Sequence, residues 1–566
     1  MEMTTGTHPV RPVPAGPDAA GAARLARPPW AWIALIAVAA VAVELAVSAR
    51  YGYVRDELYF LSAGQHLAFG YVDQPPLTPL LARLGAALTG NTLVGFRVLP
   101  ALALGALVVM TAMMSGRLGA GRTGQVLAAL AAATCGEYLG AMHELTTTTP
   151  DFVFWAATLL LVMKLLASRD PRWWVAIGGC AGLASEAKWN IAFLLAALAA
   201  GFLLTDARRL LRSRYLLIGG LITAALAAPD LIWQAAHGWP GLEVFRALQT
   251  EAGHNRLVYW PGQVLYTGLV LTPLWVAGAA WSLRSTAARP FRPVAIACVA
   301  VIVLQFALGG KPYYAGAAFT FLLAAGCVPL ERRLARRRAS SSPAPASSSP
   351  APTPPAPAPT PPAPAPTPPA PAPASPAPAP ASPAPAPASL SRAPAFWAGA
   401  AMVASAALAL PGTLPVLPAR VLHTIPLQKI NYDLGEEISW PSLVALVARE
   451  YQARPTAQRA RITILTGNYG EAGAIERYGP GDGLPQAYSG ANNFWLWGPP
   501  PAADTAAIAV NFDPGLLRRE FAHVRQIATF WNGLGIDDDE QGVPVYLATG
   551  LKTTWAKAWP AFRDYS

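Results

Sequence analysis

Long apolar runs alternate with short polar loops over much of this chain. The first run, residues 30–49, is nearly free of charge and is long enough to cross about 30 Å of hydrocarbon. Comparable runs follow at about 93–115, 123–142, 152–168, 173–187, 189–205, 215–235, 259–283, 292–309, 312–330 and 394–412. The pattern therefore predicts an all-α polytopic membrane domain with about eleven transmembrane helices.

Lysine and arginine gather in alternate loops between these runs. The basic loops are those at 117–122, 164–172, 208–214, 284–292 and 332–338. Because cytoplasmic loops of membrane proteins carry the excess of Lys and Arg, we place these loops inside the cell. The residues 1–29 then form a cytoplasmic N-terminal tail, and everything after residue 412 lies outside. We expect a multi-pass protein of the bacterial plasma membrane.

The composition changes after the main block of apolar runs, which we take as a membrane domain over 30–330. Residues 331–393 are first basic and then rich in Pro, Ala and Ser, and 339–389 contain only Ala, Ser, Pro and Thr. Such a tract cannot bury a core, so it predicts a disordered cytoplasmic linker. The run at 394–412 is expected to be the last transmembrane helix.

Residues 413–566 are typical of a soluble external domain. Short β-branched segments predict strands at 461–465, 506–510 and 543–547, and residues 471–478 suit a helix. We therefore expect a small α/β domain here. The acidic run at 537–540 is interpreted as a solvated loop.

The net charge of the chain adds little to what the basic loops already indicate about membrane topology. The chain is 53% hydrophobic and 13% charged, with a net charge of +11 that comes mostly from the basic loops. These loops suit an anionic inner leaflet of the lipid bilayer, and no motif for nucleic acid is present. The four cysteines lie in apolar runs and match neither a zinc site nor a disulfide framework.

The first predicted external loop, residues 50–92, carries the most informative polar residues. The acidic pair Asp56 and Glu57 follows the first apolar run directly. An acidic pair at the end of a transmembrane helix is costly unless it faces water, a cation or a substrate. One carboxylate is enough to take the proton from an attacking hydroxyl in an inverting sugar transfer. The alternative is a solvated loop carboxylate paired with Arg55.

The same loop also predicts two short helices lying on the membrane surface. Leu58, Leu61 and Leu67 would face the lipid in the first, with tyrosines near the headgroups. Residues 77–88 would form the second, with Pro at its start.

Other loops supply groups that a phosphate or a sugar would need. Lys311 stands at an external helix start before Tyr314, and Lys188 lies in a short turn, where either could contact a lipid phosphate. Lys311 could equally be a lysine that extends to the interface among aromatic side chains. Asp151 could shape a sugar pocket or cap the next helix. A divalent metal near His143 is left open.

Taken as an ordered set, these motifs resemble the GT-C membrane glycosyltransferases, in particular the bacterial glycosyltransferase family 39. That branch lies within the superfamily of protein O-mannosyltransferases and aminoarabinose lipid A transferases. The segments that carry the resemblance are 55–59, 71–77, 149–151, Lys188, 311–314 and 466–472. The long Pro/Ala tract departs from the family pattern, and histidine-rich features of protein mannosyltransferases are missing.

The resemblance implies a polyprenyl-phosphate sugar donor, an external active site and an inverting mechanism. It implies catalytic roles for Asp56 and Glu57, with Asp73, Asp151, Lys188, Lys311 and Tyr314 binding substrate. The expected partners are the donor, an envelope acceptor and the bilayer, with no cofactor required. A membrane transporter and a non-catalytic envelope scaffold are the alternatives.

Overall fold

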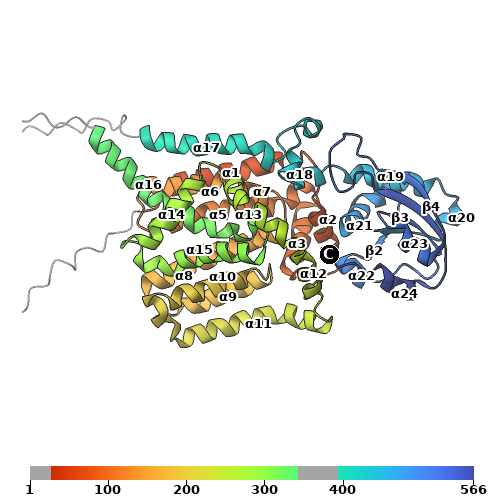
Figure 1. Ribbon diagram of the computed structural model, residues 1–566, viewed down its shortest axis with the longest axis horizontal. Helices are drawn as coiled ribbons and strands as arrows, with labels where there is room; N and C mark the ends of the chain where they lie inside the picture. Colours follow the sequence, from red (N-terminus) through yellow and green to blue (C-terminus); the bar gives the residue numbers. More distant parts are fainter. Residues whose placement is uncertain (1–26, 342–392, 566) are drawn as a thin grey trace, which may run out of the picture.

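The computed structural model describes residues 27–341 and 393–565. A bundle of helices forms one end of the molecule, and a domain with a β-sheet, built from the last part of the chain, forms the other (Figure 1). Most of the predicted tail at 1–29, and nearly all of the Pro/Ala tract, lie outside the described residues.

Seven helical segments in the described residues are long and apolar enough to cross a membrane. They are built on α1 (Trp30–Val47), α5 (Val98–Arg117), α8 (Thr148–Ser168), α11 (Arg214–Ala236), α15 (Arg292–Leu308), α16 (Phe319–Ser341) and α17 (Ala393–Thr413). Each coincides with a predicted run. The protein is therefore a multi-pass membrane protein.

The other four predicted runs are shorter or broken. The run at 259–283 forms α13 (Ala252–Thr267) and α14 (Thr272–Arg284), which are bent by 102°. The run at 123–142 divides into α6 (Arg122–Ala133) and α7 (Gly136–Ala141), and α9 (Trp173–Ser185) and α10 (Ile191–Leu203) have 13 residues each. A helix of that length rises only about 20 Å. The count of eleven spans stays a prediction.

Small residues bring the helices of the bundle close together. A Cβ atom added to Gly178 of α9 would come within 2.1 Å of the carbonyl oxygen of Gly219 in α11. Such close approach is typical of helix pairs in membranes, where packing rather than apolar burial holds helices together.

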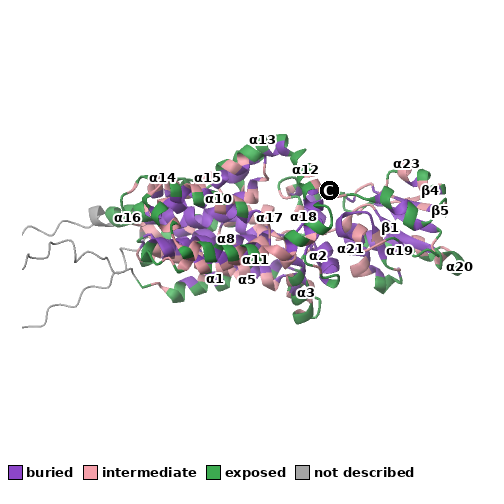
Figure 2. Cartoon of the chain, turned by 90° about the horizontal axis from the view of Figure 1, so that it is seen from below, coloured by how far each residue is buried: buried purple, intermediate pink, exposed green. Residues whose placement is uncertain are grey.

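Residues 50–92 form α2 (Arg55–Gln65) and α3 (Leu77–Thr89), and α4 (Leu93–Phe96) follows. α3 projects from the body with much of its surface exposed, as expected for an interfacial helix (Figure 2). The prediction for α2 is wrong. Leu58 is 0% and Leu61 8% exposed, because the C-terminal domain packs over this helix and shares an apolar core with it. The tyrosines Tyr53, Tyr59 and Tyr71 are also buried in protein.

The C-terminal domain contains a five-stranded sheet of order β2-β1-β3-β5-β4. Its strands are β1 (Ile462–Thr466), β2 (Ala487–Ser489), β3 (Ala506–Val510), β4 (Phe521–Thr529) and β5 (Pro544–Leu551). β1 pairs in parallel with β2 and β3, whereas β5 is antiparallel to β3 and β4. The helices of this domain are α18 (Asp433–Glu436), α19 (Trp440–Gln452), α20 (Thr456–Arg459), α21 (Tyr469–Tyr478), α22 (Asn492–Leu496), α23 (Pro514–Glu520) and α24 (Trp555–Ala558).

The predicted α/β domain is confirmed, and the three predicted strands are present within a few residues. The strands missed by the sequence are β2, which has three residues, and β4, an edge strand with charged and polar side chains exposed on it. Neither shows the apolar pattern by which a strand is recognised.

Candidate functional site

The candidate site lies where the bundle meets the C-terminal domain, around the first turn of α2. Asp56 stands in this turn and accepts a hydrogen bond from the Tyr469 hydroxyl at 3.0 Å. Tyr469 begins α21, whose start is fixed by Asn468 accepting the Glu471 N–H and by Glu471 accepting the Asn468 N–H. α2 and α21 lie close together at Gly473, where an added Cβ would be 2.8 Å from the Leu58 carbonyl.

Glu57, the neighbour of Asp56, is fully buried. Arg97 binds both of its carboxylate oxygens, Nε to Oε1 at 3.0 Å and Nη2 to Oε2 at 2.7 Å. The N–H groups of Val54 and Leu145 donate to the same carboxylate at 3.1 Å each. With these contacts Glu57 holds the start of α2 in place, and it presents no open face to a substrate.

Arg97 is the hub of a buried charge network. Besides Glu57 it contacts Glu437 of the C-terminal domain at 2.9 Å and the carbonyl oxygens of Ser48 and Gly52. It also lies 2.9 Å from a ring nitrogen of His143, whose other nitrogen is 3.1 Å from Glu44. The network connects the bundle to the C-terminal domain at Glu57, the residue that follows Asp56.

Lys188 brings positive charge into the same site. Its ammonium lies 4.7 Å from the ring centre of Tyr314 and 5.5 Å from that of Tyr313. Burial lowers the pKa of Lys188; the Asp151 and Asp56 carboxylates oppose this, whereas Lys311 adds to it. Asp151, Asp56 and Lys311 are therefore near enough to Lys188 for their charges to act on it.

Asp151, at the start of α8, is 1% exposed. Its Oδ2 accepts from Asn190 Nδ2 at 3.2 Å, and the same amide donates to the Tyr314 carbonyl at 2.8 Å. Gln305 in turn donates to Asn190 at 2.8 Å. The network fixes the turn before α16 that carries Lys311 and Tyr314. Lys311 itself is 37% exposed and lies 4.0 Å from Glu251.

Asp73 is linked to Asp56 through two tyrosines, Tyr59 and Tyr469, whose ring centres are 5.0 Å apart. Its carboxylate accepts hydrogen bonds from Tyr59 at 2.9 Å and from Asn492 of the C-terminal domain at 3.3 Å. Burial raises the pKa of Asp73 to about 7; hydrogen bonds oppose the shift, and the Asp56 charge adds to it. Contacts thus connect Asp56 with Asp73 through Tyr469 and Tyr59. They connect Asp151, Lys188 and Tyr314 in the turn that begins at Lys311, whereas Glu57 is held by Arg97.

Two residues of the C-terminal domain belong to the site and were missed as site residues by the sequence. One is Tyr469, which binds Asp56, and the other is Asp433 in α18. Burial raises the pKa of Asp433 to about 6, with a further contribution from Asp56. Tyr469 lies within the motif at 466–472, which could have indicated it, but no signal surrounds Asp433.

The acidic run at 537–540 is a loop, as predicted, but it is solvated only in part: Asp537 and Asp539 are exposed, whereas Asp538 is half-buried. Asp539 forms an ion pair with Arg55 at 3.1 Å, and Glu540 is 1% exposed. Because Arg55 is engaged by Asp539, the predicted alternative of an Asp56–Arg55 pair is not the contact observed. Within residues 27–341 and 393–565 no group of three or more His, Cys, Asp or Glu side chains is arranged to hold a metal ion.

Comparison with known proteins bears directly on this fold. Residues 73–233 match the family described as dolichyl-phosphate-mannose-protein mannosyltransferase. The crystal structure of ArnT from Cupriavidus metallidurans bound to undecaprenyl phosphate aligns with 92% of this chain and 98% of its own, with a TM-score of 0.53. The sequence identity is 16%. The chain has the GT-C glycosyltransferase fold.

A second ArnT structure from the same organism, in the apo state, aligns over 91% of this chain and 98% of its own, again with 16% identity and a TM-score of 0.53. No curated protein sequence matches the chain. Because more than nine-tenths of the chain is aligned, the similarity in fold includes both the bundle and the C-terminal domain.

Proposed function

We propose that the protein is an inverting glycosyltransferase. It moves a sugar from a polyprenyl-phosphate-linked donor to an acceptor outside the bacterial plasma membrane, such as a glycolipid, a cell-wall polymer or a protein. The ArnT structure with the same fold holds undecaprenyl phosphate. The family matched by residues 73–233 is named for a dolichyl-phosphate sugar. Both favour a donor whose sugar is carried on a lipid phosphate.

The observation that carries the proposal is the set of charges at one site. The Tyr469 hydroxyl holds the Asp56 carboxylate at 3.0 Å, and the Lys188 ammonium lies 4.7 Å from the ring centre of Tyr314, whose turn begins at Lys311. A base that accepts a proton and cations that stabilise a leaving phosphate are the two groups the reaction needs.

In the proposed reaction, an acceptor hydroxyl attacks the anomeric carbon of the donor sugar. The new C–O bond forms as the bond to the phosphate oxygen breaks, and one displacement inverts the anomeric centre. The hydroxyl proton passes to Asp56. The bonding electrons leave on the polyprenyl phosphate, whose added negative charge Lys188 and Lys311 stabilise.

The remaining predicted residues take supporting roles. Asp73 and Asp151 line the sugar pocket, and Tyr314 packs beside Lys188. Glu57 is assigned a positioning role instead of a catalytic one, because Arg97 occupies both of its oxygens. The positive-inside pattern supports an external C-terminal domain, and the choice between hexose and pentose stays open. The proposed displacement requires no cofactor.

The test is a comparison of the bacterial envelope with and without the gene. Mass spectrometry of its glycolipids, cell-wall polymers and glycoproteins should reveal a missing sugar mass in the deletion strain. The wild-type gene should restore that mass, whereas a gene carrying Asp56→Asn should not. Unchanged glycoconjugates in the deletion strain, or full restoration by Asp56→Asn, would contradict the proposal.

A further inference from the structure

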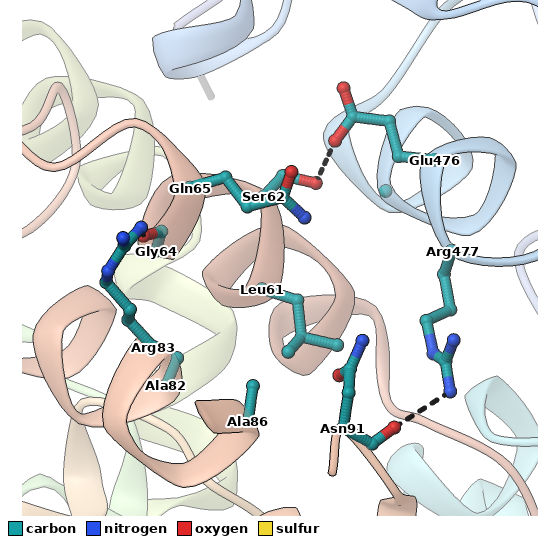
Figure 3. A pocket seen from close by; sticks show the side chains of 11 residues that line it. Leu61, Ser62, Gly64, Gln65, Ala82, Arg83, Ala86, Asn91, Glu476 and Arg477 are labelled. Carbon is teal, nitrogen blue, oxygen red and sulfur yellow. Dashed lines mark hydrogen bonds between the residues drawn. The ribbon is translucent and has the colours of Figure 1, made fainter. Parts of the chain in front are cut away.

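A partly open hollow lies on the far side of α2 from Asp56. It has a volume of about 120 Å³ and is lined by residues of α2, α3 and α21 and by Asn91. Figure 3 shows a floor formed by Leu61, Ala82 and Ala86, with the arginines Arg83 and Arg477 on opposite sides. We call this hollow the α3 cavity. None of the groups assigned to sugar transfer lines it.

The two arginines lie on opposite sides of the α3 cavity. Arg83 donates one hydrogen bond to the Gly64 carbonyl at 3.1 Å, and Arg477 donates one to the Asn91 carbonyl at 3.0 Å. The Arg477 guanidinium also packs over the rings of Tyr53 and Tyr478, 5.6 and 5.8 Å from their centres. The Nε atom of Arg477 is buried and has no hydrogen-bond partner among the described residues. A guanidinium carries five N–H donors in a planar fork that matches phosphate.

The polar wall of the cavity suits hydroxyl groups. Ser62 and Glu476 are hydrogen-bonded to each other across α2 and α21, as Figure 3 shows. The carboxylate is held against α2 by this contact. With two arginines and one glutamate the lining carries a net positive charge, which favours an anionic ligand with hydroxyl groups.

An apolar face adjoins the cavity on α3. Leu80, Leu84 and Leu88 recur every four residues and are 41%, 46% and 80% exposed. Arg83 lies on the same helix beside them. Because the neighbouring bundle spans a membrane, this leucine face would contact the acyl region of the bilayer. An interfacial helix with an arginine at its edge is typical of sites that bind anionic lipid.

We propose that the α3 cavity binds the glycerol-phosphate headgroup of an anionic phospholipid, in the leaflet next to the C-terminal domain. The phosphate contacts the guanidinium group of Arg83, and Arg477 adds positive charge from the other side of the cavity. The headgroup hydroxyls reach Ser62 and Glu476, and the acyl chains lie along the leucine face of α3. The bound lipid fixes α3 against α21 and so anchors the C-terminal domain to the membrane. This inference is independent of the sugar-transfer reaction.

The experiment is native mass spectrometry of the full-length protein in detergent, titrated with phosphatidylglycerol or with phosphatidylcholine of the same acyl chains. Phosphatidylglycerol should bind the wild type about tenfold more tightly, because hydrogen bonds to charged groups contribute that much. Arg83→Gln should remove most of this preference. Arg50→Gln is the matched control, since Arg50 is an exposed arginine at the end of α1 that does not line the cavity.

A second variant keeps the charges unchanged. Ala86→Phe fills the cavity and should weaken phosphatidylglycerol binding while thermal unfolding stays close to that of the wild type. The inference is overturned if Arg83→Gln and Ala86→Phe bind phosphatidylglycerol like the wild type, or if both lipids bind equally. It is also overturned if inorganic phosphate displaces the lipid at equal concentration, because the site would then bind a free anion.

Discussion

The hydroxyl of Tyr469 donates a hydrogen bond to Asp56 at 3.0 Å, across 413 positions of the chain. The donor comes from the C-terminal domain and the acceptor from the loop after the first transmembrane helix. The C-terminal domain therefore completes the site instead of merely lying beside it.

Removing this hydroxyl should slow sugar transfer. Tyr469→Phe keeps the ring, which packs 5.0 Å from that of Tyr59, but leaves Asp56 without its partner. A hydrogen bond to a charged group contributes about 1.5–3 kcal/mol, so kcat should fall about ten- to a hundredfold. Steady-state kinetics measure the change. Tyr451→Phe, which loses only a contact to the Arg459 carbonyl, is the control and should retain full activity.

Breaking the buried network should cost stability. Arg97→Met leaves Glu57 and Glu437 buried without their partner, and such a loss typically destabilises a protein by about 3–5 kcal/mol. Thermal unfolding of the protein in detergent would show the drop. The control is Arg454→Met, which breaks a more exposed pair with Glu450, four residues earlier at the end of α19, and should cost less than about 1 kcal/mol. Equal effects in the two variants would contradict the anchoring role of Arg97.

Lys311 should matter for the departing phosphate. Lys311→Met removes a cation where negative charge develops, and losing one such group typically lowers kcat by about a hundredfold or more. The measurement is the rate of polyprenyl phosphate release, by chromatography and mass spectrometry. Lys552→Met, an exposed lysine of the C-terminal domain, should leave the rate unchanged. A normal rate with Lys311→Met would exclude this lysine from the phosphate site.

Asp73 should make stability depend on pH. Burial raises its pKa from 3.8 to about 7, so the folded state holds the proton more tightly than the unfolded chain. Its contribution to stability is complete below about pH 4 and is lost as the pH rises through about 7. Asp73→Asn should remove this pH-dependent contribution. The free energy of unfolding of the variant should therefore rise, relative to that of the wild type, as the pH increases from about 4 to 7. Unfolding temperatures measured from pH 4 to 8 test the sign, and Asp170→Asn, in an exposed turn, should show no such trend.

The sequence predicted the membrane helices and the C-terminal α/β domain because both leave local patterns. Long apolar runs and short β-branched segments can be read without knowledge of distant contacts. The same holds for Asp56, which is recognisable by its place after the first helix.

The contacts between the two ends of the chain could not be predicted in this way. Leu58 and Leu61 look like lipid-facing residues in sequence, but the C-terminal domain covers them. Glu57 resembles its neighbour Asp56 in chemistry, yet only the fold brings Arg97 against it. Asp433 lies in a short helix with no motif around it, so its burial and the effect of the Asp56 charge on its pKa emerge only in three dimensions.

The central claim is that Asp56 takes the proton in transfer of a sugar from a lipid phosphate. Its most direct test uses the purified full-length protein in proteoliposomes supplied with a bacterial lipid extract containing polyprenyl-phosphate sugars. Free polyprenyl phosphate is measured over time for the wild type, Asp56→Asn and the control Asp170→Asn. The wild type and the control should release it at equal rates, and Asp56→Asn should be slower by about a hundredfold or more. Release by Asp56→Asn at the wild-type rate would contradict the account.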